Sequence, residues 1–400
     1  MTYYVLIAFC IIILIAYLFD ITSRYSKIPG VLLLIITGIF IQSATAFFDF
    51  TIPDMSRMLP IMGTLGLILI VLEGSLDLTI RRDKLSLIIG SISSAIVPFV
   101  LFIGIFSYIL ANFLDYNLKM AVINIIPLAI ISSAVAIPSA SNLDPANREF
   151  IVYESSISDI IGILLFDFIL LSSGSLGFGI ARFAAEFIMT ILASIVLSTG
   201  LALMLHKINL HVKYVIIMTV IILVYALAKL IHLPSLLVVF IFGLVMNNNQ
   251  LFRNKYFIRM IDFEEFNVEL DSFKNIVAEL TFVVRSFFFI LFGFYTSLSD
   301  LLSLGNLLCS LAISISIFLL RALFFITVLR TPITPLVFFA PRGLITILLF
   351  FSIPSAMLLP FMNVGVVTQT IFITILVMTL GNMLYQKKAL STGSEAKDIR

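Results

Sequence analysis

The chain is dominated by long, nearly unbroken runs of apolar residues, and these runs decide what it can fold into. A helix that spans a bilayer needs about 20 consecutive apolar residues. Of the 400 residues, 61% are hydrophobic and only 12% are charged, whereas about 25% of a soluble domain is charged. The composition therefore excludes a soluble globular protein and a disordered one. It also excludes a transmembrane barrel, because the strands of a barrel alternate polar and apolar residues.

We expect an all-α membrane protein with about 13 transmembrane helices. The predicted spans are approximately 3–19, 28–42, 60–79, 85–110, 120–142, 149–172, 178–205, 213–231, 233–248, 276–297, 302–328, 335–353 and 363–385. Most Lys and Arg residues fall in the loops of one side, which predicts an N-terminus outside the cell and a C-terminus in the cytoplasm. We expect a multi-pass protein of a bacterial plasma membrane that contacts lipid. The scattered loop charges predict no nucleic-acid partner.

A repeated pattern divides the chain into two halves. Pro and Gly lie nine positions apart both in Pro29/Gly38 and in Pro234/Gly243. The matching runs are seven helices apart, and because seven is odd, the two halves would have opposite orientations in the membrane. Inverted repeats of this kind are typical of secondary transporters. Chance similarity between apolar runs is the alternative.

These patterns predict one transmembrane domain over residues 1–385 and a short cytoplasmic tail at 386–400. The repeats would cover about 3–172 and 213–385, with a linker helix at about 178–205. The charge-rich segment 249–275 is predicted to be a cytoplasmic linker.

A cluster of polar residues interrupts the predicted helix over 149–172. It consists of Glu154, Ser155, Ser158 and Asp159. Ser155 and Asp159 are four residues apart and therefore share a helical face. Ionisable residues at membrane depth are candidate functional sites, and hard cations prefer oxygen ligands. The cluster predicts a site where Asp159 and Ser155 bind a monovalent cation or Asp159 binds a proton. A polar clamp between helices is the alternative.

Prolines lie within two further apolar runs. The run ISSAVAIPSASN contains Pro138 among several serines, including Ser132 and Ser133, and the run FFAPRGLITILL contains Pro341 directly before Arg342. We expect both helices to be broken near these prolines, leaving backbone groups free to bind ions. Simple proline kinks are the alternative.

Three more ionisable residues are expected near the site. Arg342 must be paired at this depth, and we expect Glu154 from the opposite repeat to be its partner. Arg285 is predicted to lie close to the crossing as an accessory residue. Glu73, in the run ending LIVLEGSLDL, is expected to reach the site.

Five segments of the chain resemble those of the monovalent cation/proton antiporter superfamily, and specifically its NhaP/NHE-like sodium/proton exchangers. They read LIVLEGSLDL, ISSAVAIP, YESSISDIIGILLFDF, VVRSFFFILFGF and FFAPRGLITILL. The resemblance covers about residues 5–385. It implies a thirteen-helix fold with two crossed broken helices, a homodimer, and alternating access.

The resemblance also implies roles for individual residues. Asp159 matches the aspartate that binds cation and proton, Ser155 its hydroxyl ligand, and Glu73 an acidic residue that closes the site. Glu154 and Arg342 match a structural ion pair. Two positions depart from the family pattern. Ser158 replaces an asparagine, and Ser132-Ser133 replaces Thr-Asp, so that a second carboxylate is absent.

We therefore predict a secondary antiporter that exchanges Na+ or K+ for H+ by competition at Asp159, with one-for-one electroneutral coupling. Ser158, Ser132 and Ser133 are candidate hydroxyl ligands. No P-loop, HExxH or CxxC motif is present, so we expect neither an enzyme nor a bound cofactor. Two alternatives stay open: a potassium-efflux or channel-like relative, favoured by the missing carboxylate, and a membrane sensor that has lost transport.

Overall fold

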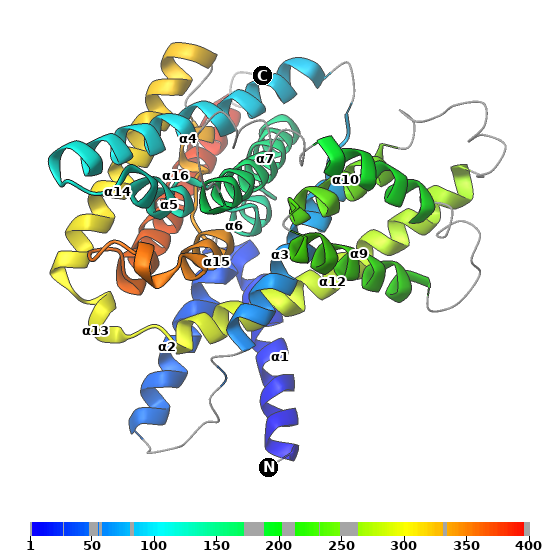
Figure 1. Cartoon of the computed structure of the whole chain (residues 1–400), viewed down its shortest axis with the longest axis horizontal. Coiled ribbons are helices and arrows are strands. Elements are labelled where there is room, and N and C mark those ends of the chain that lie inside the picture. The colour runs from blue at the N-terminus through cyan, green and yellow to red at the C-terminus, as the bar shows by residue number, and fades with distance from the viewer. Residues whose placement is uncertain are drawn as a thin grey trace. The chain divides into compact units, whose positions relative to one another are not determined.

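The structure is a computed structural model that describes residues 2–26, 28–47, 55, 58–80, 84–171, 188–201, 213–231, 233–248, 263–330 and 334–395. Every regular element in these ranges is a helix (Figure 1). The predicted all-α architecture is thereby confirmed.

The labelled α-helices are α1 (Thr2–Ser26), α2 (Gly30–Phe47), α3 (Met58–Asp77), α4 (Leu85–Phe113), α5 (Leu118–Ala129), α6 (Ser133–Ser139), α7 (Pro145–Leu171), α9 (Lys213–Leu230), α10 (Ser235–Asn247), α12 (Phe263–Phe294), α13 (Leu298–Leu301), α14 (Leu304–Phe324), α15 (Leu344–Ser352) and α16 (Val364–Glu395). Short helical turns cover Phe325–Leu329, Leu336–Phe338 and Ser355–Met357. Among the described residues, seven helices are long and apolar enough to cross a membrane, and four apolar helices are shorter. The total of thirteen spans stays a prediction.

The chain divides into two compact units. The first comprises Met1–Met62, Leu87–Ser158 and Ser286–Arg400, and the second comprises Gly63–Ser86 and Asp159–Arg285. In the first unit α14 packs against α16, α1 against α2, and α15 against α5. In the second unit α9 packs against α10.

The glycines of the repeated Pro–Gly pattern both lie at close helix crossings. In the first unit a Cβ on Gly38 of α2 would collide with the backbone of Ile290 and Phe294 in α12. In the second unit a Cβ on Gly243 of α10 would collide with Ser75 of α3. In the predicted repeats, α2 corresponds to α10 and α3 to α12, so the two contacts are reciprocal. This reciprocity supports the inverted repeat, which stays a prediction.

Three predicted segments have other boundaries in the structure, or are only partly covered by the described residues. Helix α12 begins at Phe263, so the second half of the predicted 249–275 linker is helical, and residues 249–262 lie outside the described part. Helix α16 continues to Glu395, through most of the predicted tail. The predicted 178–205 helix is described only over Ile188–Leu201.

Asparagine side chains tie together the end of α10 and the residues after α3 in the second unit. Asn248 accepts a bond from the Ile80 backbone at 2.6 Å and donates to the Leu78 carbonyl at 2.8 Å. Asn247 also donates to Leu78 and accepts from Lys274 of α12 at 2.7 Å. These side-chain amides therefore provide hydrogen-bond partners for backbone groups that have none within the helix where α3 ends.

Candidate functional site

Helix α7 carries the predicted cluster of polar residues, and the structure buries all of it. Glu154, Ser155, Ser158 and Asp159 are each at most 2% exposed. The Ser155 hydroxyl donates to the Ile151 carbonyl one turn earlier, at 2.7 Å. That bond uses the only hydrogen of the hydroxyl, so its lone pairs remain available as ligands.

Ser158 connects α7 to an interruption in the neighbouring run. Its hydroxyl oxygen accepts a hydrogen bond from the Ile131 backbone at 3.0 Å. Ile131 lies between the end of α5 and the start of α6, where the chain is extended. Asp159 follows Ser158 directly on α7.

The predicted break in this run exists, but not at Pro138. Helix α5 ends at Ala129 and α6 starts at Ser133, while Pro138 lies inside α6. The expectation was wrong by about six residues, because contacts of the break with Ser158 and Pro341, which are distant in the chain, fix its position. Ser132 lies in the break, and its hydroxyl is buried without a hydrogen-bond partner among the described residues. Ser133 is buried at the first position of α6.

The second break occurs where it was expected. Residues Phe339–Gly343 separate the turn Leu336–Phe338 from α15. The two breaks meet within the first unit, because the Ser132 backbone donates to the Pro341 carbonyl at 2.9 Å. A Cβ on Gly343 would lie 2.6 Å from the Ser132 hydroxyl oxygen. Any larger residue would force Ser132 to shift, so the crossing explains the glycine at position 343.

Glu154 pairs with Arg321 of α14, and not with Arg342 as the sequence suggested. Both carboxylate oxygens bind guanidinium nitrogens at 2.6 Å. The Ser94 hydroxyl of α4 also donates to Glu154. Glu154 is fully buried and Arg321 is 2% exposed. The bidentate ion pair compensates both of these buried charges.

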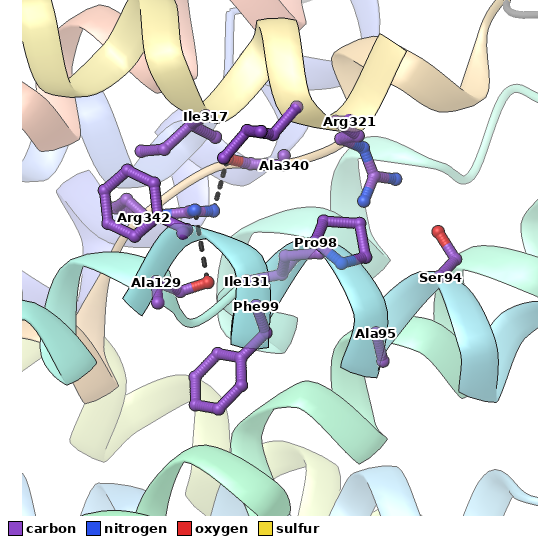
Figure 2. A pocket seen from close by; sticks show the side chains of 12 residues that line it. Ser94, Ala95, Pro98, Phe99, Ala129, Ile131, Ile317, Arg321, Ala340 and Arg342 are labelled. Atoms are coloured by element: carbon purple, nitrogen blue, oxygen red, sulfur yellow. Dashed lines mark hydrogen bonds between the residues drawn. The ribbon is translucent and has the colours of Figure 1, made fainter. Parts of the chain in front are cut away.

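Arg342 has a different role from the one predicted. Its guanidinium donates to the carbonyls of Leu128 at 2.6 Å, Ala340 at 2.9 Å and Ala129 at 3.2 Å. Figure 2 shows the side chain between Ala340 and Ala129. Leu128 and Ala129 are the last residues of α5, whose terminal carbonyls lack partners in their own helix. Arg342 therefore satisfies the broken end of α5.

Arg321 is a functional candidate that the sequence reading did not assign. It is an arginine within an apolar run, which is itself a signal. Its guanidinium also donates to the Leu336 and Val337 carbonyls at 2.8 and 3.1 Å. The sequence suggested only Arg342 as the partner of Glu154, and the tertiary structure shows that Arg321 is the partner.

Glu73 and Arg285, the remaining predicted residues, lie in the second unit. Glu73 of α3 lies next to Thr281 of α12 and within the electrostatic influence of Arg285. Asp167, further along α7, pairs with Lys229 at 3.1 Å. The part of the chain that the structure describes holds no group of three or more His, Cys, Asp or Glu side chains able to hold a metal.

The comparisons with known proteins agree with this architecture. A sequence model described as the transmembrane sodium/hydrogen exchanger matches residues 10–385. The chain belongs to the sodium/hydrogen exchanger family. It is an integral multi-pass membrane protein of a family of transporters that exchange cations for protons. Among curated proteins no match to this exchanger is found.

Two solved structures share the exchanger's fold. Both are of the sodium proton antiporter MjNhaP1 from Methanocaldococcus jannaschii. The structure at pH 8 is 20% identical with a TM-score of 0.70, covering 94% of this chain and 97% of that chain. The electron-microscopy structure is 17% identical with a TM-score of 0.72, covering 98% of each chain. The predicted antiporter fold of the NhaP type is thus confirmed.

Proposed function

We propose that this exchanger moves Na+ or K+ against H+ at Asp159. The observation that carries the proposal is the burial of Asp159, which is 1% exposed and directly follows Ser158 on α7. A buried carboxylate binds a cation or a proton, and each species displaces the other. In a chain of the sodium/hydrogen exchanger family, we therefore assign the exchange of cation for proton to the Asp159 carboxylate.

The ligands on α7 are oxygen atoms of the kind that alkali cations prefer. Ser155 shares a helical face with Asp159 and keeps its lone pairs free. Glu154 is engaged by Arg321 on both oxygens, so we assign it a structural role instead of transport. Ser158, Ser132, Ser133 and Glu73 remain predicted contributors.

One titrating carboxylate favours one-for-one, electroneutral exchange. A pH difference of one unit provides about 1.4 kcal/mol per proton, which supports about a tenfold cation gradient. We propose that the exchanger works by alternating access as a homodimer, with its N-terminus outside and its C-terminus in the cytoplasm.

K+ is proposed as a substrate because the break between α5 and α6 offers hydroxyls in place of a carboxylate. Ser132 and Ser133 are buried there. A site with fewer negative charges compensates dehydration less well, which favours the cation that loses water more easily. Of the two common cations, that is K+.

Competition is tested by measuring apparent cation affinity against pH in proteoliposomes, with Na+, K+ and Li+ in turn. Where protons occupy most sites, each unit of rising pH should strengthen the apparent affinity by up to about tenfold. An affinity that is flat from acid to mildly alkaline pH would contradict competition at one carboxylate. Flux that generates a membrane voltage would exclude electroneutral exchange and favour the channel-like alternative.

A further inference from the structure

A small cavity in the first unit lies between the two buried arginines (Figure 2). Arg321 and Arg342 line it together with mainly apolar side chains, among them Ala95, Phe99 and Ile317. Its volume is about 20 Å³, which is enough for one particle of about the size of water. No acidic side chain is among the described residues that line it.

The charges around this cavity do not balance. Glu154 compensates Arg321, whereas the side-chain hydrogen bonds of Arg342 go to three neutral carbonyls. Arg342 is only 3% exposed, and a guanidinium does not release its proton in proteins. The three side chains therefore carry one net positive charge in a buried place, where an uncompensated charge is costly.

Hydrogen-bond donors also remain. A guanidinium has five N–H groups, and Arg342 uses three of them, which leaves two. They belong to Nη1 and Nη2, each of which makes one hydrogen bond to the described residues and has a second hydrogen. Arg321 uses Nη1 once, toward Glu154, so it also keeps one N–H. The cavity thus combines a surplus of positive charge with unused donors from both of the arginines that line it.

We propose that this cavity binds a small monovalent anion, namely a halide such as chloride, held by the guanidinium groups of Arg342 and Arg321. The two cations repel Na+ and K+, and the small volume favours a monatomic anion over phosphate and carboxylates. Bound halide would compensate Arg342 and stabilise the crossing of the two breaks. The site does not depend on the proposed exchange at Asp159, because either can exist without the other.

Thermal unfolding of the purified full-length protein tests the site. Melting is compared in potassium chloride, potassium bromide and potassium gluconate at equal ionic strength, so that only the anion differs. Chloride and bromide should raise the melting temperature by about 2–5 °C over gluconate and saturate with concentration. Equal melting temperatures in all three salts would overturn the proposal.

A variant that fills the cavity tests whether the halide-dependent rise in melting temperature arises at this cavity. Ala95 lines the cavity and is 2% exposed, so Ala95→Val should abolish the halide response while leaving both arginines intact. Ala16→Val in α1, where the alanine is equally buried, is the matched control and should keep the response. A full halide response in folded Ala95→Val would overturn the assignment.

Anomalous scattering from bromide gives a measurement that does not depend on any variant's folding. Crystals grown in bromide should show a peak between the Arg321 and Arg342 guanidinium groups. Bromide found only elsewhere on the protein, or nowhere, would contradict the proposal.

Discussion

The two breaks in the first unit look alike in the sequence, since each lies in an apolar run that contains a proline, but they carry opposite chemistry. The break after α5 presents serine hydroxyls and the carbonyls of Leu128 and Ala129, which accept hydrogen bonds from Arg342. The break before α15 supplies the charge of Arg342. A helix C-terminus carries partial negative charge, so the arginine of one break neutralises the end of the other. The two breaks therefore stabilise each other: one supplies carbonyl groups, and the other supplies the arginine that binds them.

The largest effect is expected from the ion pair that lies next to this crossing. Glu154→Gln or Arg321→Gln should each destabilise the protein by about 3–5 kcal/mol, because each leaves a buried charge unpaired. The double variant should lose less than the sum of the singles. Melting temperatures in detergent measure all four proteins. In the parallel cycle of Glu154 with Arg342, the coupling should be weaker than that of Glu154 with Arg321; an equal or stronger coupling would restore the pairing that the sequence suggested.

Arg342→Lys should be less harmful than loss of the ion pair. Lysine keeps the charge but cannot place donors on the Leu128, Ala129 and Ala340 carbonyls at once. We expect a loss of about 2–4 kcal/mol, in keeping with hydrogen bonds that involve a charged group. Arg330→Lys, which changes an exposed arginine that makes no side-chain hydrogen bond to the described residues, is the control for the substitution itself. Wild-type stability in Arg342→Lys would mean that the two breaks are not held together by this side chain.

Gly343→Ala should cost about 1–3 kcal/mol, because the new methyl group would press on the Ser132 hydroxyl at 2.6 Å. Gly104→Ala in α4, where a Cβ meets nothing within 4 Å, should be neutral or slightly stabilising. Ser132→Gly should partly rescue Gly343→Ala, since it removes the nearest atoms. Equal melting of the two alanine variants would show that the breaks do not approach so closely.

Ser133→Asp tests the absence of charge in the first break, and it has the smallest expected effect. If Ser133 faces the transported ion, the added carboxylate should tighten apparent cation affinity by about tenfold, or 1.4 kcal/mol, and shift preference from K+ toward Na+ or Li+. Flux and melting temperature are measured on the same protein, with Ser139→Asp in the last turn of α6 as control. A folded Ser133→Asp with unchanged ion preference would remove the main support for K+ transport.

The sequence was sufficient for the helical fold and for the polar cluster on α7, because apolar runs and buried charges are local signals. It also indicated the break at Pro341-Arg342-Gly343, because the proline and the glycine on either side of Arg342 both disfavour a helix. It misplaced the break near Pro138 and the partner of Glu154. Both depend on groups that are distant in the chain: Pro341 and Arg342 fix the end of α5, and the position of α14 brings Arg321 to Glu154. No spacing rule within one helix contains that information.

The central claim is that the carboxylate of Asp159 carries the exchange, and replacing it tests that claim most directly. In proteoliposomes with a pH gradient, wild-type protein should move Na+ or K+ against protons, and Asp159→Asn should show no exchange while melting as a folded protein. Asp167→Asn is the matched control on the same helix, because its pair with Lys229, which is 55% exposed, contributes little to stability. This control should retain most of the flux. Undiminished pH-driven flux in folded Asp159→Asn would contradict the account.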